Sequence, residues 1–176
     1  MFGFFDGIMK QEQEYERLKT LKQQFKTAKD LGVKECVKCG WCCNRRTCIP
    51  TPEEFKKIAE YLRLSVQECI KKYFCVDKQS SDDFCYVKPA GVNQQDLIGK
   101  FIPCDRTYNE GKCVFLVDNN LCKIHDVKPL SAKLLECWND NENEGDEIIK
   151  AWKEYYKNNH DLDFINEKND YDEDDD

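Results

Sequence analysis

The chain has 176 residues, 40% of them hydrophobic and 35% charged, which is enough for one small domain with extensions. Its net charge is −7, but residues 161–176 alone carry −8, so the rest is nearly neutral and gives no support for nucleic-acid binding. No apolar run approaches the roughly 20 residues of a membrane span, and the first residues lack the pattern of a secretory signal. The protein is therefore expected in the cytoplasm. In that reducing compartment its twelve cysteines are expected to be metal ligands or redox groups.

Residues 1–32 are predicted to form an amphipathic helical arm. Apolar side chains recur at three- and four-residue steps between Tyr15 and Leu31, and Gly32 is placed to end the helix. We expect this helix to pack on its own domain. Docking on a protein partner or a second copy is the alternative, and the acidic C-terminus is another segment that would contact a basic partner.

Two short helices are predicted after the cysteine-rich segment. Thr51 and Glu54 have the spacing of a capping box, and Phe55 begins the apolar stripe of the first helix. Ser65 and Glu68 repeat the same box at the start of the second helix. Both boxes satisfy backbone N–H groups that a helix start leaves without partners, so these helices should begin at fixed positions.

The stretch from 76 to 111 is polar, and we expect it to be mostly loop with short strands at 84–88 and 97–102. A hairpin is predicted next, with strands at 113–117 and 121–125 joined by an Asp-Asn-Asn turn.

Further helices are predicted at 129–138 and 146–157. The fold class is therefore α+β: a small, helix-rich protein with a short β-hairpin and loops organised around a cysteine metal site. The predicted domains are the arm at 1–32, a metal-binding domain at 33–138, a helical extension at 139–165 and an acidic disordered tail at 166–176.

The cysteines at 36–43 form a dense CxxCxxCC motif. Two residues between cysteines allow a tight turn to direct both sulfurs to one point, as in zinc and iron–sulfur sites. Gly40 allows the backbone to reverse beside Cys39. Neighbouring side chains diverge, so Cys42 and Cys43 are expected to bind different metals, or one of them to pack structurally.

The charge around this motif favours a thiolate site, because nearby positive charge lowers the pKa of a thiol. The charged residues there sum to +3 and comprise Lys34, Glu35, Lys38, Arg45 and Arg46. Cys48 lies just beyond the motif and offers a further ligand.

A second group of cysteines lies in the second half of the chain. Cys113 and Cys122 are placed to face each other across the predicted hairpin. We expect the metal site to join both groups, because the first motif alone gives poor geometry for four ligands to one centre. Cys36, Cys39 and one of Cys42 or Cys43 are expected to share a site with Cys122 or Cys113. The full set of candidate ligands is Cys36, Cys39, Cys42, Cys43, Cys104, Cys113, Cys122 and Cys137. Apart from Cys48, the other cysteines are expected to be buried apolar thiols: Cys69, Cys75 and Cys85.

These motifs resemble the YkgJ-like cysteine-cluster family, whose CxxCxxCC domains chelate zinc or iron. Beyond the cysteine motif, residues 51–62 are similar to the family's T-x-E-E helix and residues 64–73 to its next helix. Residues 111–125 are similar to its G-x-C-x-F-L and C-x-I-Y hairpin, and residues 128–130 to its R-P-L element. The resemblance covers roughly residues 33–138 and implies metal binding.

The chain departs from the family pattern at two positions. The family has a cysteine three residues after the proline, where this chain has Ala132. Either Cys137 replaces that cysteine or the site lacks one ligand. The family's aromatic residue after C-x-I is His125 here, which is either a ligand, a residue that supports a ligand, or an ordinary surface or core histidine.

Three functions are compatible with these features. The first is a protein carrying an iron–sulfur cluster, expected to be 4Fe-4S, with a redox or accessory role, because thiols are abundant and histidines scarce. The second is a structural zinc-binding interaction module. The third is an enzyme with a methyl-transfer or thiol-redox role, since flagellin lysine N-methylase resembles the chain through the cysteine motif and Cys36 with Cys39 has the spacing of a CxxC redox pair. No catalytic motif or glycine-rich loop is present in the sequence, so we do not expect that activity.

Overall fold

The computed structural model describes residues 16–17, 19–20, 22–32, 36–79, 84–103, 106, 112–117, 120–134 and 144–159. Its elements in chain order are α2 (Ala28–Leu31), α3 (Trp41–Arg45), α4 (Pro52–Tyr61), α5 (Val66–Tyr73), β1 (Phe74–Gln79), β2 (Phe84–Pro89), η1 (Val92–Leu97), η4 (His125–Val127), α6 (Leu130–Leu134) and α7 (Glu144–Asn158). The α+β class predicted from the sequence is confirmed, because helices surround a two-stranded antiparallel sheet.

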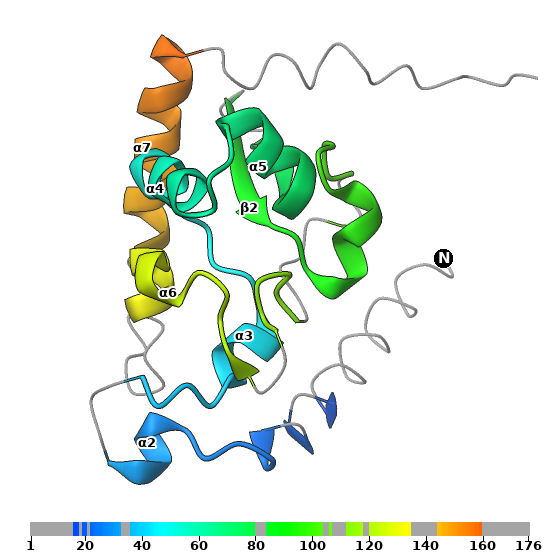
Figure 1. The fold of residues 1–176 in the computed structure, drawn as a ribbon, viewed down its shortest axis with the longest axis vertical. Coiled ribbons are helices and arrows are strands. Elements are labelled where there is room, and N and C mark those ends of the chain that lie inside the picture. Colours follow the sequence, from blue (N-terminus) through cyan, green and yellow to red (C-terminus); the bar gives the residue numbers. More distant parts are fainter. Residues whose placement is uncertain are drawn as a thin grey trace, which may run out of the picture.

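The core lies between the sheet and the helices α4, α5 and α7 (Figure 1). The Phe55 ring of α4 lies 4.9 Å from the Phe74 ring and 6.4 Å from the Trp152 ring, measured between ring centroids. The ring centroids of Phe74 and Phe115 are 5.6 Å apart. Phe115 belongs to the segment that carries the second group of cysteines. The core therefore continues directly into the cysteine-rich end of the molecule.

The two capping boxes predicted from the sequence are confirmed. The Thr51 N–H donates to the Glu54 carboxylate at 2.9 Å, and the Glu54 N–H donates to the Thr51 hydroxyl at 3.3 Å. Ser65 and Glu68 make the same pair of bonds at the start of α5, at 2.8 and 3.2 Å. The helix predicted at 146–157 is also present, as α7.

The strands differ from the prediction. The residues from 76 onward are predicted to be mostly loop, but β1 begins at Phe74 and pairs antiparallel with β2 along its whole length. The strand predicted at 84–88 is present in β2, whereas that predicted at 97–102 is wrong. Gly99 (φ +77°) turns the chain there, and a single bridge joins Phe101 to Val76.

The hairpin predicted at 113–125 is reduced to a tight reversal. Among its described residues, a bridge joins Leu116 to Cys122, and the Val117 N–H donates to the Leu121 carbonyl oxygen at 2.9 Å. A second strand cannot continue, because the chain enters the 3₁₀ helix η4 at His125. The helix predicted at 129–138 is described only as the short α6, and residues 135–143 lie outside the described part of the structure.

The arm is not one continuous helix among its described residues. The chain leaves the helix before Phe25, and a new helix, α2, begins after Thr27. A third local box marks the start of α2, because the Thr27 N–H donates to the Asp30 carboxylate at 2.9 Å and the Asp30 N–H donates to the Thr27 hydroxyl at 3.3 Å. The Phe25 ring lies 6.0 Å from the Trp41 ring, so this part of the arm contacts the cysteine domain. Gly32 has φ +66°, as a helix end requires.

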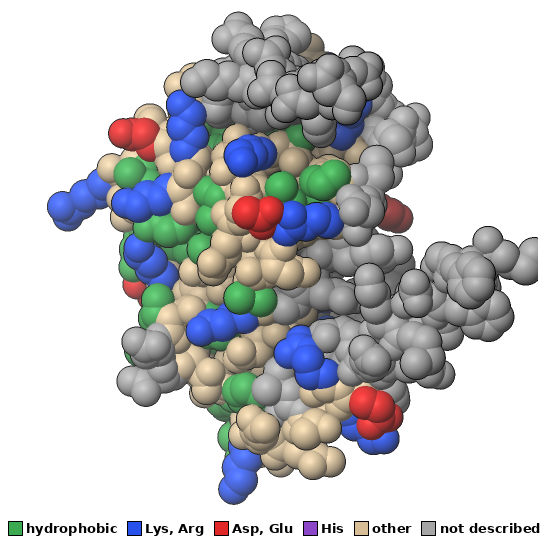
Figure 2. Space-filling model, turned by 90° about the vertical axis from the view of Figure 1, so that its right-hand side faces the viewer, with side chains coloured by type: hydrophobic (Ala, Val, Ile, Leu, Met, Phe, Trp, Pro, Cys, Tyr) green, Lys and Arg blue, Asp and Glu red, His purple; other side chains and the backbone are tan. Residues whose placement is uncertain are grey.

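The surface of the described part is rich in positive charge. Figure 2 shows Lys and Arg side chains spread over one face between small hydrophobic areas, with few described Asp or Glu side chains among them. Among the described residues, no helix is long and apolar enough to cross a membrane. The acidic tail predicted at 166–176 lies outside the described residues.

Candidate metal centre

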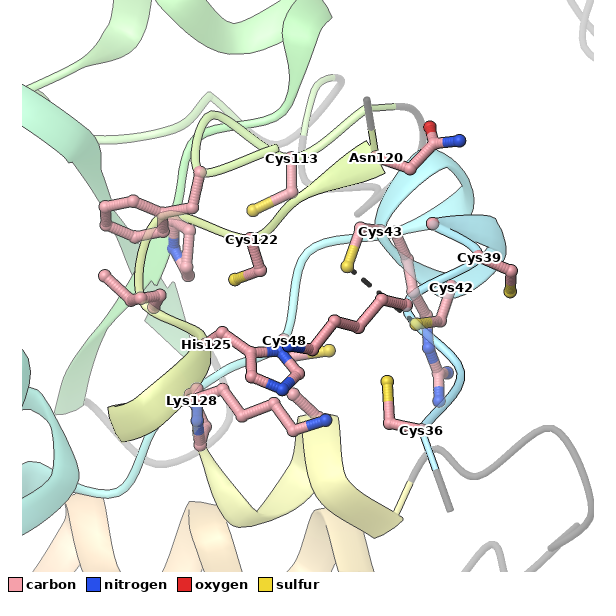
Figure 3. Close-up of a pocket in the computed structure, with 18 of the residues that line it drawn as sticks. Cys36, Cys39, Cys42, Cys43, Cys48, Cys113, Asn120, Cys122, His125 and Lys128 are labelled. Carbon is pink, nitrogen blue, oxygen red and sulfur yellow. Dashed lines mark hydrogen bonds between the residues drawn. The ribbon is translucent and has the colours of Figure 1, made fainter. Parts of the chain in front are cut away.

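A cavity of about 250 Å³ lies between α3 and the segment from Cys113 to Ala132 (Figure 3). Seven cysteines line it: Cys36, Cys39, Cys42, Cys43, Cys48, Cys113 and Cys122. The structure thus brings six of the eight predicted ligands to one cavity, from both halves of the chain. The other two, Cys104 and Cys137, lie outside the described residues.

The first group of thiols depends on a backbone reversal at Gly40. Gly40 is the N-cap of α3 with φ +82°, and Lys38 also adopts a positive φ of 52°. The chain reverses as the sequence predicts, and Cys42 and Cys43 follow in the first turn of α3. Their sulfurs are 3.8 Å apart, and both side chains line the same cavity despite being neighbours in sequence.

The second group is held against the first by the backbone. The Cys113 N–H donates to the Cys43 carbonyl oxygen at 2.8 Å, and Cys113 also forms a bridge with Gly91. Two apolar core residues of this segment, Phe115 and Ile124, reach the cavity as well. The cavity is therefore a sulfur-rich extension of the hydrophobic core.

Three thiols form a hydrogen-bonded set around Cys43. The pKa of Cys43 is strongly raised, because its proton is shared in hydrogen bonds with Cys122 and Cys42 and because the thiol is buried. Accepting from Cys43 lowers the pKa of Cys42 to about 6 and that of Cys122 to about 7, with the Lys128 charge helping in both cases. Within this set, Cys42 and Cys122 thus ionise before Cys43.

Burial has the opposite effect on two other thiols. It raises the pKa of Cys48 and of Cys113 to about 12 in each case. A metal ion in the cavity would reverse this effect, because its positive charge favours the thiolate form of each ligand. Metal binding at this site must therefore release protons from buried thiols.

The rest of the lining is cationic or neutral. Arg46, Lys38 and Lys128 face the cavity, and none of the described residues that line it is Asp or Glu. His125 lines it too, and burial together with Lys128 lowers the pKa of its imidazole. Cationic neighbours offset the negative charge of several thiolates, so the donor set fits a thiophilic metal centre rather than a hard cation.

The residues outside the predicted set are also informative. Cys48 lines the cavity although it stands outside the CxxCxxCC spacing, and only its nearness to the motif in sequence marked it. Ala132 lines the cavity too, so the position that departs from the family pattern belongs to this site. The thiols predicted to be apolar core residues are confirmed as buried: Cys69, Cys75 and Cys85.

The thiols surround the cavity without converging on one point. Within the described ranges, no group of three or more His, Cys, Asp or Glu side chains is arranged to hold a single metal ion. The arrangement instead distributes sulfurs around the cavity, as Figure 3 shows for Cys36, Cys42, Cys43, Cys48, Cys113 and Cys122, whereas the Cys39 sulfur points away from the others.

Comparison with known proteins identifies the family. The family model CxxCxxCC, described as a "putative zinc- or iron-chelating domain", matches residues 35–160. The chain belongs to the CxxCxxCC family. The uncharacterized protein MJ0661 of Methanocaldococcus jannaschii is 29% identical to this chain over 100 residues. The match covers 56% of this chain and 42% of that protein, so the chain spans less than half of the relative's length. No solved structure matches the chain. Membership of this family supports metal binding, with zinc or iron as the metal.

Proposed function

We propose that this protein binds an iron–sulfur cluster, of the four-iron type, and serves a redox or accessory role. The observation that carries the proposal is the set of seven thiols around one cavity. A structural zinc ion is complete with four ligands, whereas seven thiols exceed that number. Iron–sulfur clusters are held by thiolates, and four of the seven thiols would suffice for one cluster.

The spacing of the sulfurs supports the same proposal. A four-iron cluster is larger than a single ion, so its ligands approach it from different sides without meeting at one point. The described thiols agree with this in that no three of them are arranged for one ion, whereas the Cys42 and Cys43 sulfurs, 3.8 Å apart, are as close as two ligands of one ion. The exposed position of Cys36 would leave one edge of the cluster accessible to an electron-transfer partner.

A structural zinc module is the second candidate. Cys36 and Cys39 with the turn at Gly40 have the form of the knuckles that hold zinc. In that case the metal would join the CxxCxxCC segment to the reversal at Cys113–Cys122 and would act through folding stability. None of the ten cysteines that the structure describes forms a disulfide, which fits a reducing compartment such as the cytoplasm for either candidate.

Anaerobic purification of the full chain, followed by metal and acid-labile sulfide analysis, tests the proposal. We expect iron and sulfide in equal amounts, about four of each per chain. Cys122→Ser should lose most of the iron, and Cys69→Ala, which removes a buried thiol outside the cavity, should retain it. Zinc without sulfide in the wild-type protein would refute the cluster and establish the zinc candidate.

A further inference from the structure

The segments that carry the cavity thiols differ in how many contacts fix them to the rest of the protein. Cys113 is bonded through its N–H to the carbonyl oxygen of Cys43 at 2.8 Å. Cys48 lies two residues before Pro50, whose carbonyl oxygen accepts the indole N–H of the buried Trp152 at 2.7 Å. We call these thiols and their neighbours in α3 and in the reversal the inner thiols: Cys42, Cys43, Cys48, Cys113 and Cys122.

The outer thiols, Cys36 and Cys39, have no such support. Residues 36–39 belong to no helix or strand, and they make no hydrogen bond to any other residue that the structure describes. Cys36 is exposed. The two outer thiols therefore stay at the cavity only if the residue that follows them, Gly40, is held in place.

Gly40 is held by an asparagine from the other half of the site. A Cβ atom on Gly40 would lie 2.5 Å from Cβ of Asn120, so the two residues touch with no room for a side chain between them. The Asn44 side-chain amide donates to the Gly40 carbonyl oxygen at 3.0 Å and to the Asn120 carbonyl oxygen Oδ1 at 3.5 Å. We call Gly40, Asn44 and Asn120 the clasp.

The backbone of Asn120 shows why asparagine suits this position. Its φ is +59°, in the left-handed region that only glycine and asparagine or aspartate adopt readily. Asn120 thus lies in the reversal between Leu116 and Cys122 and at the same time places its side chain against Gly40. One residue therefore couples the turn that carries Cys122 to the loop that carries the outer thiols.

We propose that Asn120 is a positioning residue of the metal centre: it holds the 36–40 loop against the inner thiols, and thereby sets how fast the metal is exchanged. The inference rests on metal binding in the cavity and not on which metal binds. With the clasp closed, Cys36 and Cys39 remain beside the metal. With the clasp open, the loop moves away and an incoming ligand can reach the metal that the inner thiols still hold.

Substitutions separate the side chain of Asn120 from its backbone conformation. Asn120→Gly keeps the left-handed turn and removes the contact with Gly40. Asn120→Asp keeps the shape, the turn and an oxygen that accepts from Asn44. Asn93→Ala is a matched control, because Asn93 is an exposed asparagine of η1 outside the cavity lining.

The experiment uses the full chain, loaded with whichever metal the wild-type protein binds. Excess chelator is added, and metal release is followed over time beside the thermal melting of the metal-free protein. Loss of residues that support metal ligands weakens metal binding about 10- to 100-fold, so Asn120→Gly should load fully but release metal about tenfold faster or more. Its metal-free form should melt as the wild type does. Asn120→Asp and Asn93→Ala should release metal within about twofold of the wild-type rate.

A double variant adds a direct test of the clasp. If Asn44 and Asn120 act together, Asn44→Ala combined with Asn120→Gly should release metal no faster than the faster single variant. Release from Asn120→Gly at the wild-type rate would overturn the proposal. So would faster release that is matched by a lower melting temperature of the metal-free protein, because that result shows general destabilisation.

The outcomes distinguish this inference from the proposed function. Metal and sulfide analysis of the wild-type protein decides between a cluster and zinc. The comparison of release rates decides the role of Asn120 and is the same for either metal. Zinc in the wild-type chain with fast release from Asn120→Gly would refute the cluster and support the clasp.

Discussion

Truncation of Trp152 should show that α7 is part of the folded unit rather than an extension of it. The Trp152 side chain is 1% exposed, and its ring stands edge-on to Tyr155 with centroids 5.7 Å apart. Its indole N–H donates to the Pro50 carbonyl oxygen, which joins α7 to the segment that leaves the cysteine cavity. Removing a buried tryptophan side chain typically lowers the free energy of unfolding by about 3–5 kcal/mol.

Urea unfolding of the full chain, in the same metal state for every variant, measures this effect. With a slope of about 2 kcal/mol per molar urea, Trp152→Ala should lower the unfolding midpoint by about 1.5–2.5 M. Trp152→Phe keeps much of the packing against Phe55 and loses the hydrogen bond to Pro50. It should therefore lower the free energy of unfolding by about 1 kcal/mol and the urea midpoint by about 0.5 M. Glu154→Ala, on the exposed side of the same helix, should change the free energy by less than about 0.5 kcal/mol. A midpoint for Trp152→Ala that matches this control would refute the reasoning and place α7 outside the folded unit.

The remaining predictions concern the site and the surface. Cys36→Ala and Cys39→Ala should each reduce bound metal and stability together, because metal binding is coupled to folding; full metal loading in both variants would contradict this. Deletion of 166–176 should leave the metal stoichiometry unchanged, as measured by metal analysis. The Arg106 guanidinium lowers the pKa of the Asp96 carboxyl to about 2, so its stabilising contact is complete above the ordinary Asp pKa of 3.8 and is lost as the pH falls through about 2. Carboxyl NMR titration should show that midpoint, and Arg106→Gln should return it toward 3.8.

Local sequence signals were sufficient where a helix start is encoded within a few residues. The boxes at Thr51 and Ser65 satisfy backbone N–H groups three residues away, so no distant contact is needed to place α4 and α5. The reversal at Gly40 is of the same kind, since a positive φ is a property of the residue itself. The residue types and spacing of the CxxCxxCC motif therefore suffice to predict a turn at this glycine.

Strand pairing could not be predicted in the same way. Residues 74–79 come directly after the apolar face of a predicted helix. They contain both Asp77 and Lys78, so they do not alternate cleanly between apolar and polar. They form β1 because β2 supplies hydrogen-bond partners along the whole strand. Residues 97–102 have strand-like composition, but only one bridge is available to them, at Phe101. A strand depends on its neighbour, and that neighbour is a tertiary contact.

By itself, the sequence determined the starts of α4 and α5, the α+β class and the thiol-rich character of the site, because these depend on residue type and on spacing over a few positions. Only the tertiary structure decided which cysteines share a cavity. It placed Cys48 beside Cys113 and left Cys69 in the core, although all three are single cysteines outside the dense motif. The reason is that a metal centre is assembled from segments far apart in the chain, and packing alone sets the distance between them.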